Sequence, residues 1–469
     1  MMKKFQIIIS VLSLVFAWGC SDFLNEESQD EVIVHTVKDY SELLLGAGYP
    51  EPYGYLYASL FVFDDDLEID ELELKDKDHF ILTANFGCFT WQPDMWDRVA
   101  KMNESYIASY RRIMGCNAVL DGIDNAIGNQ VDRERVKAEA LAVRAYFYFQ
   151  LVNLYGQPYN ADKSALGVPL KLTAGIEENG IRRSTVEQVY NRIVEDLEEA
   201  SALLEKHPKT RGDFRINYPS VNILLSRVYL FMERWQDAIA AADRAIKSGG
   251  SLTNYTQLSA ETFYFTDYKL SEVEWIYGAN DRSVGMNAMV PSRELLSKFQ
   301  TDDRRRDLYF GKSMYTGSTV IKKQNHKEGL DMPDNVLRIS EAYLNRAEAY
   351  AHEKDGRVAA LADLNKLRRN RIVGYTDVEI TDATTLLEEI RLERRKELCF
   401  EEQRWFDLRR YGMPSISHRF RAKKTDPWKV YTLKEKDPLY TLPIPNEAIL
   451  QNRLLEQNLS RQEPIRQGL

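Results

Sequence analysis

The sequence predicts a mostly α-helical protein whose helical core carries an irregular, loop-rich face with a few short strands. Six stretches repeat apolar residues at spacings of three and four, which is typical of helices that bury one face. The segments between them are rich in aromatic residues, Asp and Gly. We expect helices at 104–127, 132–155, 185–206, 221–248, 337–371 and 385–410.

The ends of these stretches carry residues that usually begin or end helices. Residues 184–187, Ser-Thr-Val-Glu, are typical of a capping box and predict a helix start. Glycine often follows the last turn of a helix, because it adopts the left-handed conformation without strain. Three glycines stand where helices are expected to stop, namely Gly156, Gly249 and Gly412.

Two segments share a pattern of small residues and tyrosine. Segment 226–246 follows the order of a tetratricopeptide helix pair, and segment 344–360 repeats its first part. Small side chains let two helices approach closely, and the tyrosine fills the space between successive pairs, so we expect tetratricopeptide-like pairs. The residues are Ser226, Tyr229, Ala238, Ala242 and Ala245 in the first segment and Ala347, Tyr350 and Ala359 in the second.

The overall charge argues against nucleic-acid binding. The 469-residue chain has a formal net charge of −9 and a pI near 5.5, whereas nucleic-acid binders normally show a basic excess. Beyond the N-terminus no run of about 18 apolar residues occurs, so we expect no membrane-spanning helix there.

The N-terminus has the parts of a secretory signal. Lys3 and Lys4 precede an apolar stretch at 5–18, and Cys20 follows directly. This arrangement resembles the lipobox of bacterial lipoproteins, in which the mature chain begins at an acylated cysteine. Acyl chains partition into the bilayer and anchor a protein without spanning it.

Three regions follow from this interpretation. We expect a signal peptide at 1–19, an acidic tether at 20–35 and a single helical domain at 36–469.

Acidic residues after the cysteine resemble the surface-export signal of Bacteroidetes lipoproteins, which indicates an outer-membrane protein that faces the exterior. Ala17 and Trp18 depart from the Leu and small residue that the lipobox usually has.

The patterns of common enzymes and metal sites are missing from the sequence. It contains no GxSxG, HExxH, P-loop or GxGxxG motif. Its six histidines are scattered, and Cys88, Cys116 and Cys399 lack the spacing of a zinc site. Cys88 and Cys116 can still pair in an oxidising compartment. We expect no catalytic residue, no metal and no cofactor.

One charged run invites a catalytic interpretation. A glycosidase needs two carboxyls on opposite sides of a sugar, about 5–10 Å apart. Here carboxylates and arginines alternate at steps of three and four, so we interpret them as ion pairs along one helix face. The residues are Glu393, Arg394, Glu397, Glu401, Arg404, Asp407 and Arg410.

The irregular segments carry candidates for sugar binding. Aromatic rings stack on the C–H faces of a sugar, and polar side chains bond its hydroxyls. We interpret the Asp64–Asp65–Asp66 triplet mainly as a solvated loop or helix end rather than a calcium site, and Trp275 and Tyr277 as a buried strand. The expected glycan contacts are Trp91, Trp96, Asp94, Tyr53, Tyr55, Asp64, Tyr268 and Asp267.

The segment LERRKELCFEEQRWFDLRRYG, at 392–412, resembles the most distinctive motif of the RagB/SusD family. Glu402 departs from it, since the family commonly has Gly there, and we place this position in a helix interior. Other family-like segments follow the same order along the chain, at 138–158, 167–170, 183–200, 290–306, 337–350 and 442–452.

The resemblance implies an α-solenoid core of four tetratricopeptide-like pairs and an irregular face that binds a glycan or, in some members, a peptide. It also implies a partner, a SusC-like TonB-dependent outer-membrane transporter. We therefore expect a glycan-capturing lipoprotein that is not an enzyme. The alternatives are a binder of peptide cargo, a tetratricopeptide scaffold lipoprotein and, least favoured, a surface glycoside hydrolase.

Overall fold

The computed structural model describes residues 34–50, 60–72, 74, 79–97, 104–278, 288–323 and 335–469. The expected signal peptide, Cys20, Tyr53 and Tyr55 lie outside these ranges. Within them, no helix combines the length and apolar character that crossing a membrane requires.

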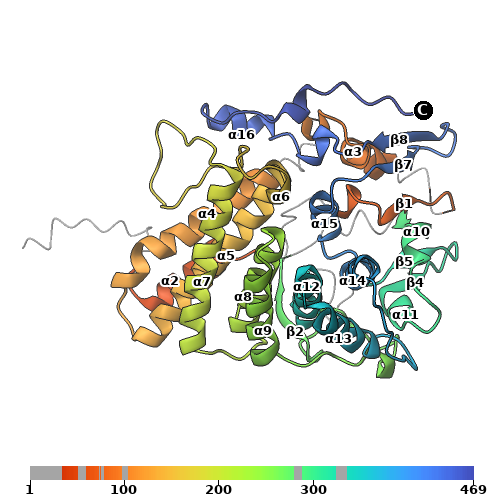
Figure 1. Cartoon of the computed structure of the whole chain (residues 1–469). Coiled ribbons are helices and arrows are strands. Elements are labelled where there is room, and N and C mark those ends of the chain that lie inside the picture. Colours follow the sequence, from red (N-terminus) through yellow and green to blue (C-terminus); the bar gives the residue numbers. More distant parts are fainter. Residues whose placement is uncertain are drawn as a thin grey trace, which may run out of the picture.

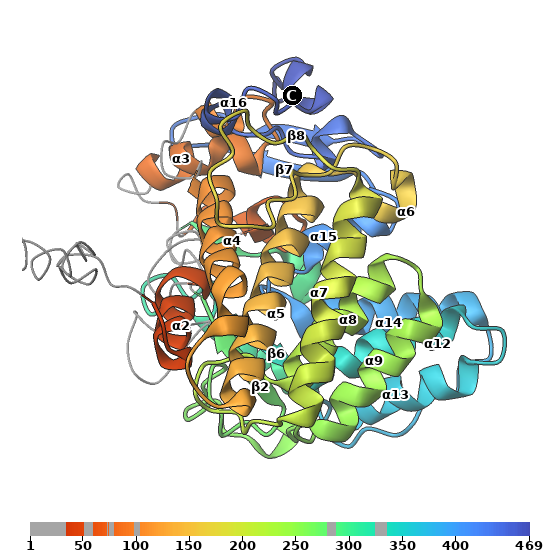
Figure 2. The same cartoon turned by 90° about the vertical axis from the view of Figure 1, so that its left-hand side faces the viewer.

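The core is a row of long helices that pack side by side in chain order (Figures 1 and 2). Helix α5 packs against α4 and α7, α8 against α7 and α9, and α12 against α9, α13 and α14. The expected mostly helical fold is confirmed. The long helices are α4 (Glu104–Gly122), α5 (Gln130–Tyr155), α7 (Val186–Lys206), α8 (Tyr218–Phe231), α9 (Trp235–Ser248), α12 (Ile339–His352), α13 (Arg357–Arg369) and α14 (Ala383–Leu398).

The rest of the described chain is short helices and strand pairs, most of which lie on one side of the row in Figure 1. The short α-helices are α2 (Val37–Leu43), α3 (His79–Phe89), α6 (Tyr159–Asp162), α10 (Arg293–Leu296), α11 (Arg305–Tyr309), α15 (Arg404–Arg410) and α16 (Asn446–Gln451). The single turns are the π-helix η2 (Leu44–Gly48) and the 3-10 helices η3 (Leu60–Val62), η5 (Met95–Asp97), η6 (Ile123–Asn125), η7 (Tyr255–Gln257), η8 (Pro438–Tyr440) and η9 (Leu459–Gln462).

The strands of the described residues form four antiparallel pairs. Strand β2 is buried along its whole length, which confirms the expected buried strand at Trp275 and Tyr277. The pairs are β1 (Leu67–Ile69) with β3 (Met289–Pro291), β2 (Val273–Tyr277) with β6 (Asn335–Arg338), β4 (Phe310–Lys312) with β5 (Thr319–Ile321), and β7 (Ile416–Phe420) with β8 (Lys429–Leu433).

Three stretches that we expected to be single helices are each divided into two helices. The stretch 221–248 divides at Glu233, which has a φ of 57°, and 337–371 divides before Gly356. The stretch 385–410 divides between α14 and α15, where Phe400 and Glu402 both have a φ of 60°. Glu402 therefore does not lie in a helix interior. Its left-handed backbone is the conformation that favours glycine, which gives a physical reason for the Gly of the family motif.

Helix ends and small residues largely follow the sequence pattern. Gly156 and Gly249 are C-caps, as expected, whereas the capping box of α7 uses Thr185 and Gln188, one residue later than expected. The alanines of the first repeat, Ala238, Ala242 and Ala245, are fully buried. Their tetratricopeptide-like character remains a prediction.

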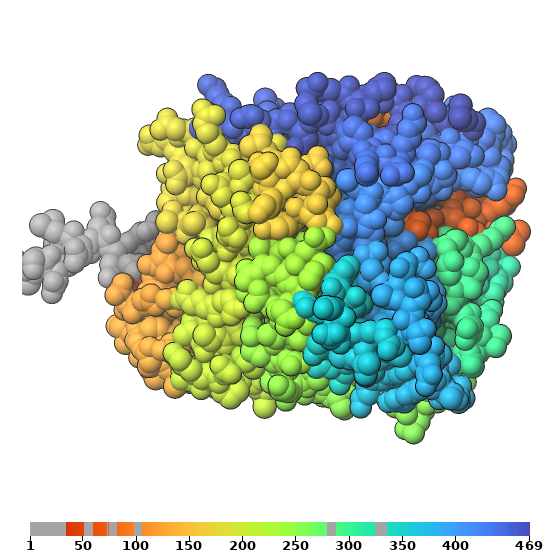
Figure 3. Space-filling view, in the orientation of Figure 1, coloured from red at the N-terminus to blue at the C-terminus, as the bar shows by residue number. Residues whose placement is uncertain are grey.

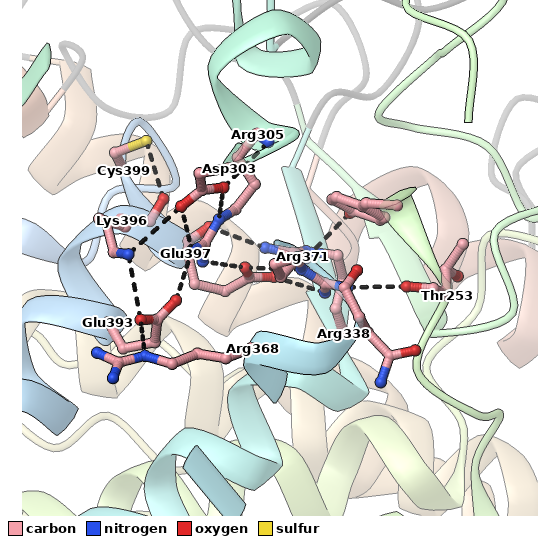
Figure 4. Close-up of polar contacts among 12 residues, drawn as sticks. Thr253, Asp303, Arg305, Arg338, Arg368, Arg371, Glu393, Lys396, Glu397 and Cys399 are labelled. Atoms are coloured by element: carbon pink, nitrogen blue, oxygen red, sulfur yellow. Dashed lines mark hydrogen bonds and ion pairs between the residues drawn. The ribbon is translucent and has the colours of Figure 1, made fainter. Parts of the chain in front are cut away.

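A buried ionic network centred on α14 joins the helical row to the irregular side (Figure 4). Glu397 accepts hydrogen bonds from Arg338 at 2.7 Å, from Arg371 at 2.8 Å and from Arg305 at 2.9 Å. One turn earlier, Glu393 pairs with Arg305 at 2.5 Å. Every one of these side chains is 0% exposed. The ionic network comprises Glu272, Asp303, Arg305, Arg338, Arg368, Arg371, Glu393, Lys396, Glu397 and Glu401.

The partners in this region come from other elements, rather than mainly from the same helix face as the sequence suggested. Arg394 of α14 binds Asp407 of α15 at 2.8 Å. Arg410 of α15 binds Glu348 of α12 at 2.7 Å. Among the described residues, Arg410 with Asp407, at 2.9 Å, and Lys396 with Glu393, at 3.2 Å, do follow the expected spacing of three. The structure thus corrects the sequence interpretation: these charges connect elements.

Burial makes each charge of the network depend on its partners. Burial alone would raise the pKa of Glu397, but Arg371 and Arg338 hold it well below its usual range. Removing one member of a buried pair leaves the other charge uncompensated, which costs about 3–5 kcal/mol.

We expect Glu397→Gln to lower the free energy of unfolding by about 3–5 kcal/mol, because three guanidinium groups lose their shared carboxylate. Urea-induced unfolding measures this loss. Glu388→Gln, at an exposed position of the same helix, is the control and should change stability by no more than about 0.5 kcal/mol. Equal effects of the two substitutions would contradict the central role of Glu397.

Acid should weaken the fold through Glu348. Burial opposes its ionisation, but Arg410 lowers its pKa from 4.5 to about 2. A carboxyl group whose pKa is lower in the folded protein stabilises the fold at any pH above its unfolded-state pKa of 4.5. This stabilisation is lost as the pH falls from 4.5 towards 2. Unfolding free energies measured across this interval should fall more steeply in the parent than in Glu348→Gln. If the unfolding free energies of the parent and of Glu348→Gln fell in parallel with pH, Glu348 would make no such contribution.

Candidate ligand-binding site

The structure places both candidate tryptophans in the core. Trp91 is 0% exposed, and its indole Nε1 donates to the carbonyl of Phe63 at 3.0 Å. Trp96 is 5% exposed and donates to the carbonyl of Pro443 at 2.6 Å. His418 stacks on Trp91 with a centroid distance of 4.3 Å. Neither indole presents an open face for a sugar, so their burial argues against the glycan contacts expected of Trp91 and Trp96, which stay predictions.

A segment far away in sequence explains this burial. Arg461 donates to the carbonyl of Pro93 at 2.8 Å, and Arg466 donates to that of Trp91 at 2.8 Å. The C-terminal residues, dark blue in Figure 3, cover the top of the molecule in this view. Asp94, between the two tryptophans, is only half-buried.

The aspartate triplet is an ion-paired structural element. Asp64 and Asp66 are buried, and Asp66 binds Arg395 at 2.8 Å, while Asp65 binds Arg404 at 2.7 Å. Burial, helped by the two neighbouring carboxylates, raises the pKa of Asp64 well above its usual range. The three carboxyl groups lie within 4.8 Å of one another, but arginines already supply the compensating charge. The expected solvated loop is therefore wrong.

The other described candidates have local structural roles. The Tyr268 hydroxyl accepts a hydrogen bond from the backbone N–H of Ile276 at 3.1 Å, and burial raises its pKa to about 12. Asp267 accepts from the N–H of Lys269 at 2.8 Å, which closes a turn. Both side chains are half-buried. Their contact with a ligand remains a prediction, as does that of Tyr53 and Tyr55.

The cysteines of the described chain are unpaired. Cys88, Cys116 and Cys399 are buried and free, so the pairing of Cys88 with Cys116 that the sequence left open is not formed. Burial raises the pKa of each thiol to about 12, which keeps it protonated at neutral pH.

A concave site lies instead between α4, the 169–181 loop and α16. This aromatic pocket has a volume of about 420 Å³, within the range of small-molecule sites. Tyrosines and aliphatic side chains form its walls, and polar groups stand at its rim. The lining residues are Tyr106, Ile107, Tyr110, Met114, Pro169, Lys171, Glu177, Gly180, Ile181, Ala448, Gln451, Asn452 and Leu455.

Hydrogen bonds hold the pocket walls in place. The Tyr110 hydroxyl donates to the carbonyl of Pro169 at 2.8 Å, and the Tyr148 hydroxyl donates to that of Lys171 at 2.7 Å. At the other wall, Asn452 donates to the carbonyl of Ile181 at 2.7 Å. The loop and α16 are thus fastened to each other and to the helical row, so the pocket is preorganised.

The chemistry of the pocket suits a polar ligand with apolar faces. Tyr106 and Tyr110 lie 5.0 Å apart between ring centroids. Burial raises the pKa of both phenols, so both are neutral at physiological pH. Lys171 and Glu177 form an ion pair at 3.2 Å on the rim. Rings, hydroxyls and a few charges are the groups that recognise sugars.

Sequence reasoning missed these tyrosines because they belong to a periodic helical run. Positions 106, 110 and 114 repeat at four-residue steps, which predicts a face packed in the core. Tyr106 is indeed 4% exposed, but Ile107, Tyr110 and Met114 are only half-buried. No signal in the sequence shows that the neighbouring loop leaves this face partly open.

A second hollow, of about 620 Å³, lies between α2 and the start of α5. Its charged side chains largely satisfy one another. Glu139 binds Arg215 at 2.6 Å, and Lys38 binds Glu42 at 3.8 Å. It offers fewer aromatic surfaces than the first, so we take the aromatic pocket as the candidate site.

The carboxylates of the ionic network do not form a hydrolytic pair. Glu393 and Glu397 are 0% exposed and are bound by arginines. A glycosidase acid and base must face a sugar in an open cleft. This geometry gives the charged run a structural role.

Comparison with known proteins gives concordant matches in both halves of the chain. Residues 65–230 match a family described as starch-binding and associating with the outer membrane, and residues 309–460 match the SusD family. SusD-like protein P2 of Formosa agariphila is 22% identical over an alignment of 408 positions, which covers 73% of this chain and 78% of that protein.

Solved structures share the fold. A SusD superfamily protein from Bacteroides vulgatus has a TM-score of 0.72 at 23% identity, over 91% of this chain and 99% of its own. A SusD superfamily protein from Bacteroides thetaiotaomicron has a TM-score of 0.69 at 23% identity, over 90% of this chain and 99% of its own. A laminarin-binding SusD-like protein has a TM-score of 0.65 at 18% identity, over 91% of this chain and 99% of its own. With matches in both halves and a shared fold, the chain belongs to the SusD/RagB family.

Proposed function

We propose that this protein is a surface-exposed outer-membrane lipoprotein that binds a glycan and delivers it to a SusC-like TonB-dependent transporter. The observation that carries the proposal is the SusD/RagB membership of both halves of the chain, combined with a preorganised aromatic pocket. The starch-binding description of one matching family and the laminarin-binding relative both favour glycan as the cargo.

The same proposal assigns three regions to the chain. Residues 1–19 act as the signal peptide, residues 20–35 as a tether acylated at Cys20, and residues 36–469 as one ligand-binding domain. The described chain begins at Val34, shortly before α2, which starts at Val37. The tether would therefore meet the domain at the α2 end, which is the left end in Figure 1.

Capture without chemical change fits the groups of the pocket. Among the described residues that line the pocket, Glu177 is the one carboxylate, and it pairs with Lys171 at 3.2 Å. Hydrolysis needs a second carboxyl across the sugar. We therefore propose binding and release of an unchanged glycan.

A panel of neutral and charged polysaccharides and peptides tests the proposed function. The full chain should retain at least one polysaccharide, release no oligosaccharide from it, and co-purify with a TonB-dependent barrel from native membranes. Released product would contradict the binding role. Retention of peptides alone would favour peptide cargo.

Narrowing the pocket should weaken glycan binding. Ile107→Trp enlarges a half-buried side chain on the pocket wall, so we expect the Kd of the retained glycan to rise about tenfold or more. Ile176→Trp, in the neighbouring loop and 91% exposed, makes the same change outside the pocket and should leave the Kd unaltered. Calorimetric titration compares the two. If Ile107→Trp binds like the parent, the glycan site lies elsewhere.

Membrane association should depend on Cys20. Cys20→Ser removes the thiol that carries the acyl chains, so the chain should move from the membrane fraction to the soluble fraction and lose incorporation of labelled palmitate. Ser21→Ala, one residue later, should behave like the parent. A Cys20→Ser chain that still fractionates with membranes would exclude this anchor.

A further inference from the structure

The β7–β8 hairpin concentrates positive charge on an acidic protein. Seven of the eighteen residues at 419–436 are Lys or Arg and only two are Asp or Glu, whereas the whole chain has a net charge of −9. Exposed charges are screened beyond about 8 Å at physiological ionic strength. The local excess, rather than the net charge of the chain, therefore determines what this surface attracts.

Most of these cations are free to bind. Arg419, Lys423, Lys424 and Lys429 are exposed, and within the described part of the chain none of them has a carboxylate at ion-pair distance. Arg421 differs, because it is 7% exposed and bound to Glu71 at 2.7 Å. Among the described residues, these four cations have no carboxylate partner and are available to a ligand.

An aromatic ring lies among these cations. Trp428 is half-buried, with the guanidinium of Arg421 at 4.4 Å and that of Arg419 at 4.6 Å from its ring centroid. The alternation of buried and exposed residues along β7 places Arg419 on the outer face of the hairpin. In the strand register, Arg419 pairs with Val430 of β8. Stacking on the ring restricts the Arg419 side chain, which lowers the entropy cost of binding an anion.

The hairpin cannot readily bind a partner by adding a strand at Val430. The backbone of Val430 exchanges two hydrogen bonds with Leu469, at 2.9 and 3.0 Å, on the side away from β7. Recognition therefore depends on side chains. A sugar polymer with carboxylate or sulfate groups fits both features, since arginine and lysine can bind the anions and the part of Trp428 that its arginines leave exposed offers an apolar surface to a sugar ring.

We infer that the β7–β8 hairpin, through Arg419, Lys423, Lys424, Lys429 and Trp428, binds a polyanionic glycan that carries uronate or sulfate groups. This inference rests on the proposed function and names the chemical class of its cargo. A glycan is favoured over an anionic membrane surface because the hairpin lies at the end of the molecule opposite α2, beside which the tether joins (Figure 1).

Polygalacturonate and its methyl-esterified counterpart test the inference, because they share a backbone and differ in charge. The full chain in detergent should bind polygalacturonate at least about tenfold more tightly, and NaCl raised from about 50 to about 500 mM should remove the difference. Lys423→Glu/Lys424→Glu should abolish the preference. Lys354→Glu/Lys366→Glu, at exposed positions on the α12–α13 side, changes the net charge equally and should retain it.

Trp428→Leu separates a glycan site from a general anion site. It should weaken polygalacturonate binding more than binding of inorganic polyphosphate, which has no sugar ring. Equal binding of the charged and esterified polymers, or unchanged binding after Lys423→Glu/Lys424→Glu, would overturn the inference and leave the proposed function standing. The inference would also be overturned, with the proposed function left standing, if the hairpin bound phosphatidylglycerol vesicles and the protein did not bind polygalacturonate. Failure to bind any polysaccharide would overturn both.

Discussion

The fold depends on carboxylates of α14 that lie in the interior and cannot ionise without their arginines. Glu397 receives guanidinium groups from α11, β6 and the turn after α13, at Arg305, Arg338 and Arg371. Each of these elements is held at a fixed distance from α14 as a result. Because an unpaired buried charge is costly, an arrangement that separated the helical row from the irregular side would leave these charges uncompensated.

This constraint explains what the most distinctive sequence motif encodes. The segment 392–412 contains three of the network carboxylates, Glu393, Glu397 and Glu401, together with the turn through Phe400 and Glu402 and the arginines of α15. Its side chains bind other parts of the protein. The motif therefore identifies the scaffold, and the two binding surfaces that we propose, the aromatic pocket and the β7–β8 hairpin, lie outside it.

The ligand site was harder to predict than the scaffold. Trp91 and Trp96 flank a Pro-Asp turn, which is ordinarily a surface feature. They are buried because Arg461 and Arg466 bring the C-terminal segment over that turn. Conversely, Tyr110 belongs to a regular helical run, yet it faces a pocket. Periodicity reports which face of a helix is apolar, but not whether a distant segment covers it.

The sequence by itself determined the helical class, the positions of most long helices and several of their ends, because periodicity and capping are local properties of the chain. It also predicted that the carboxylates at 393–407 are structural. The tertiary structure alone decided where those charges find partners, which aromatics are buried and where a pocket remains. These features depend on contacts between residues up to 375 positions apart, which no local pattern encodes.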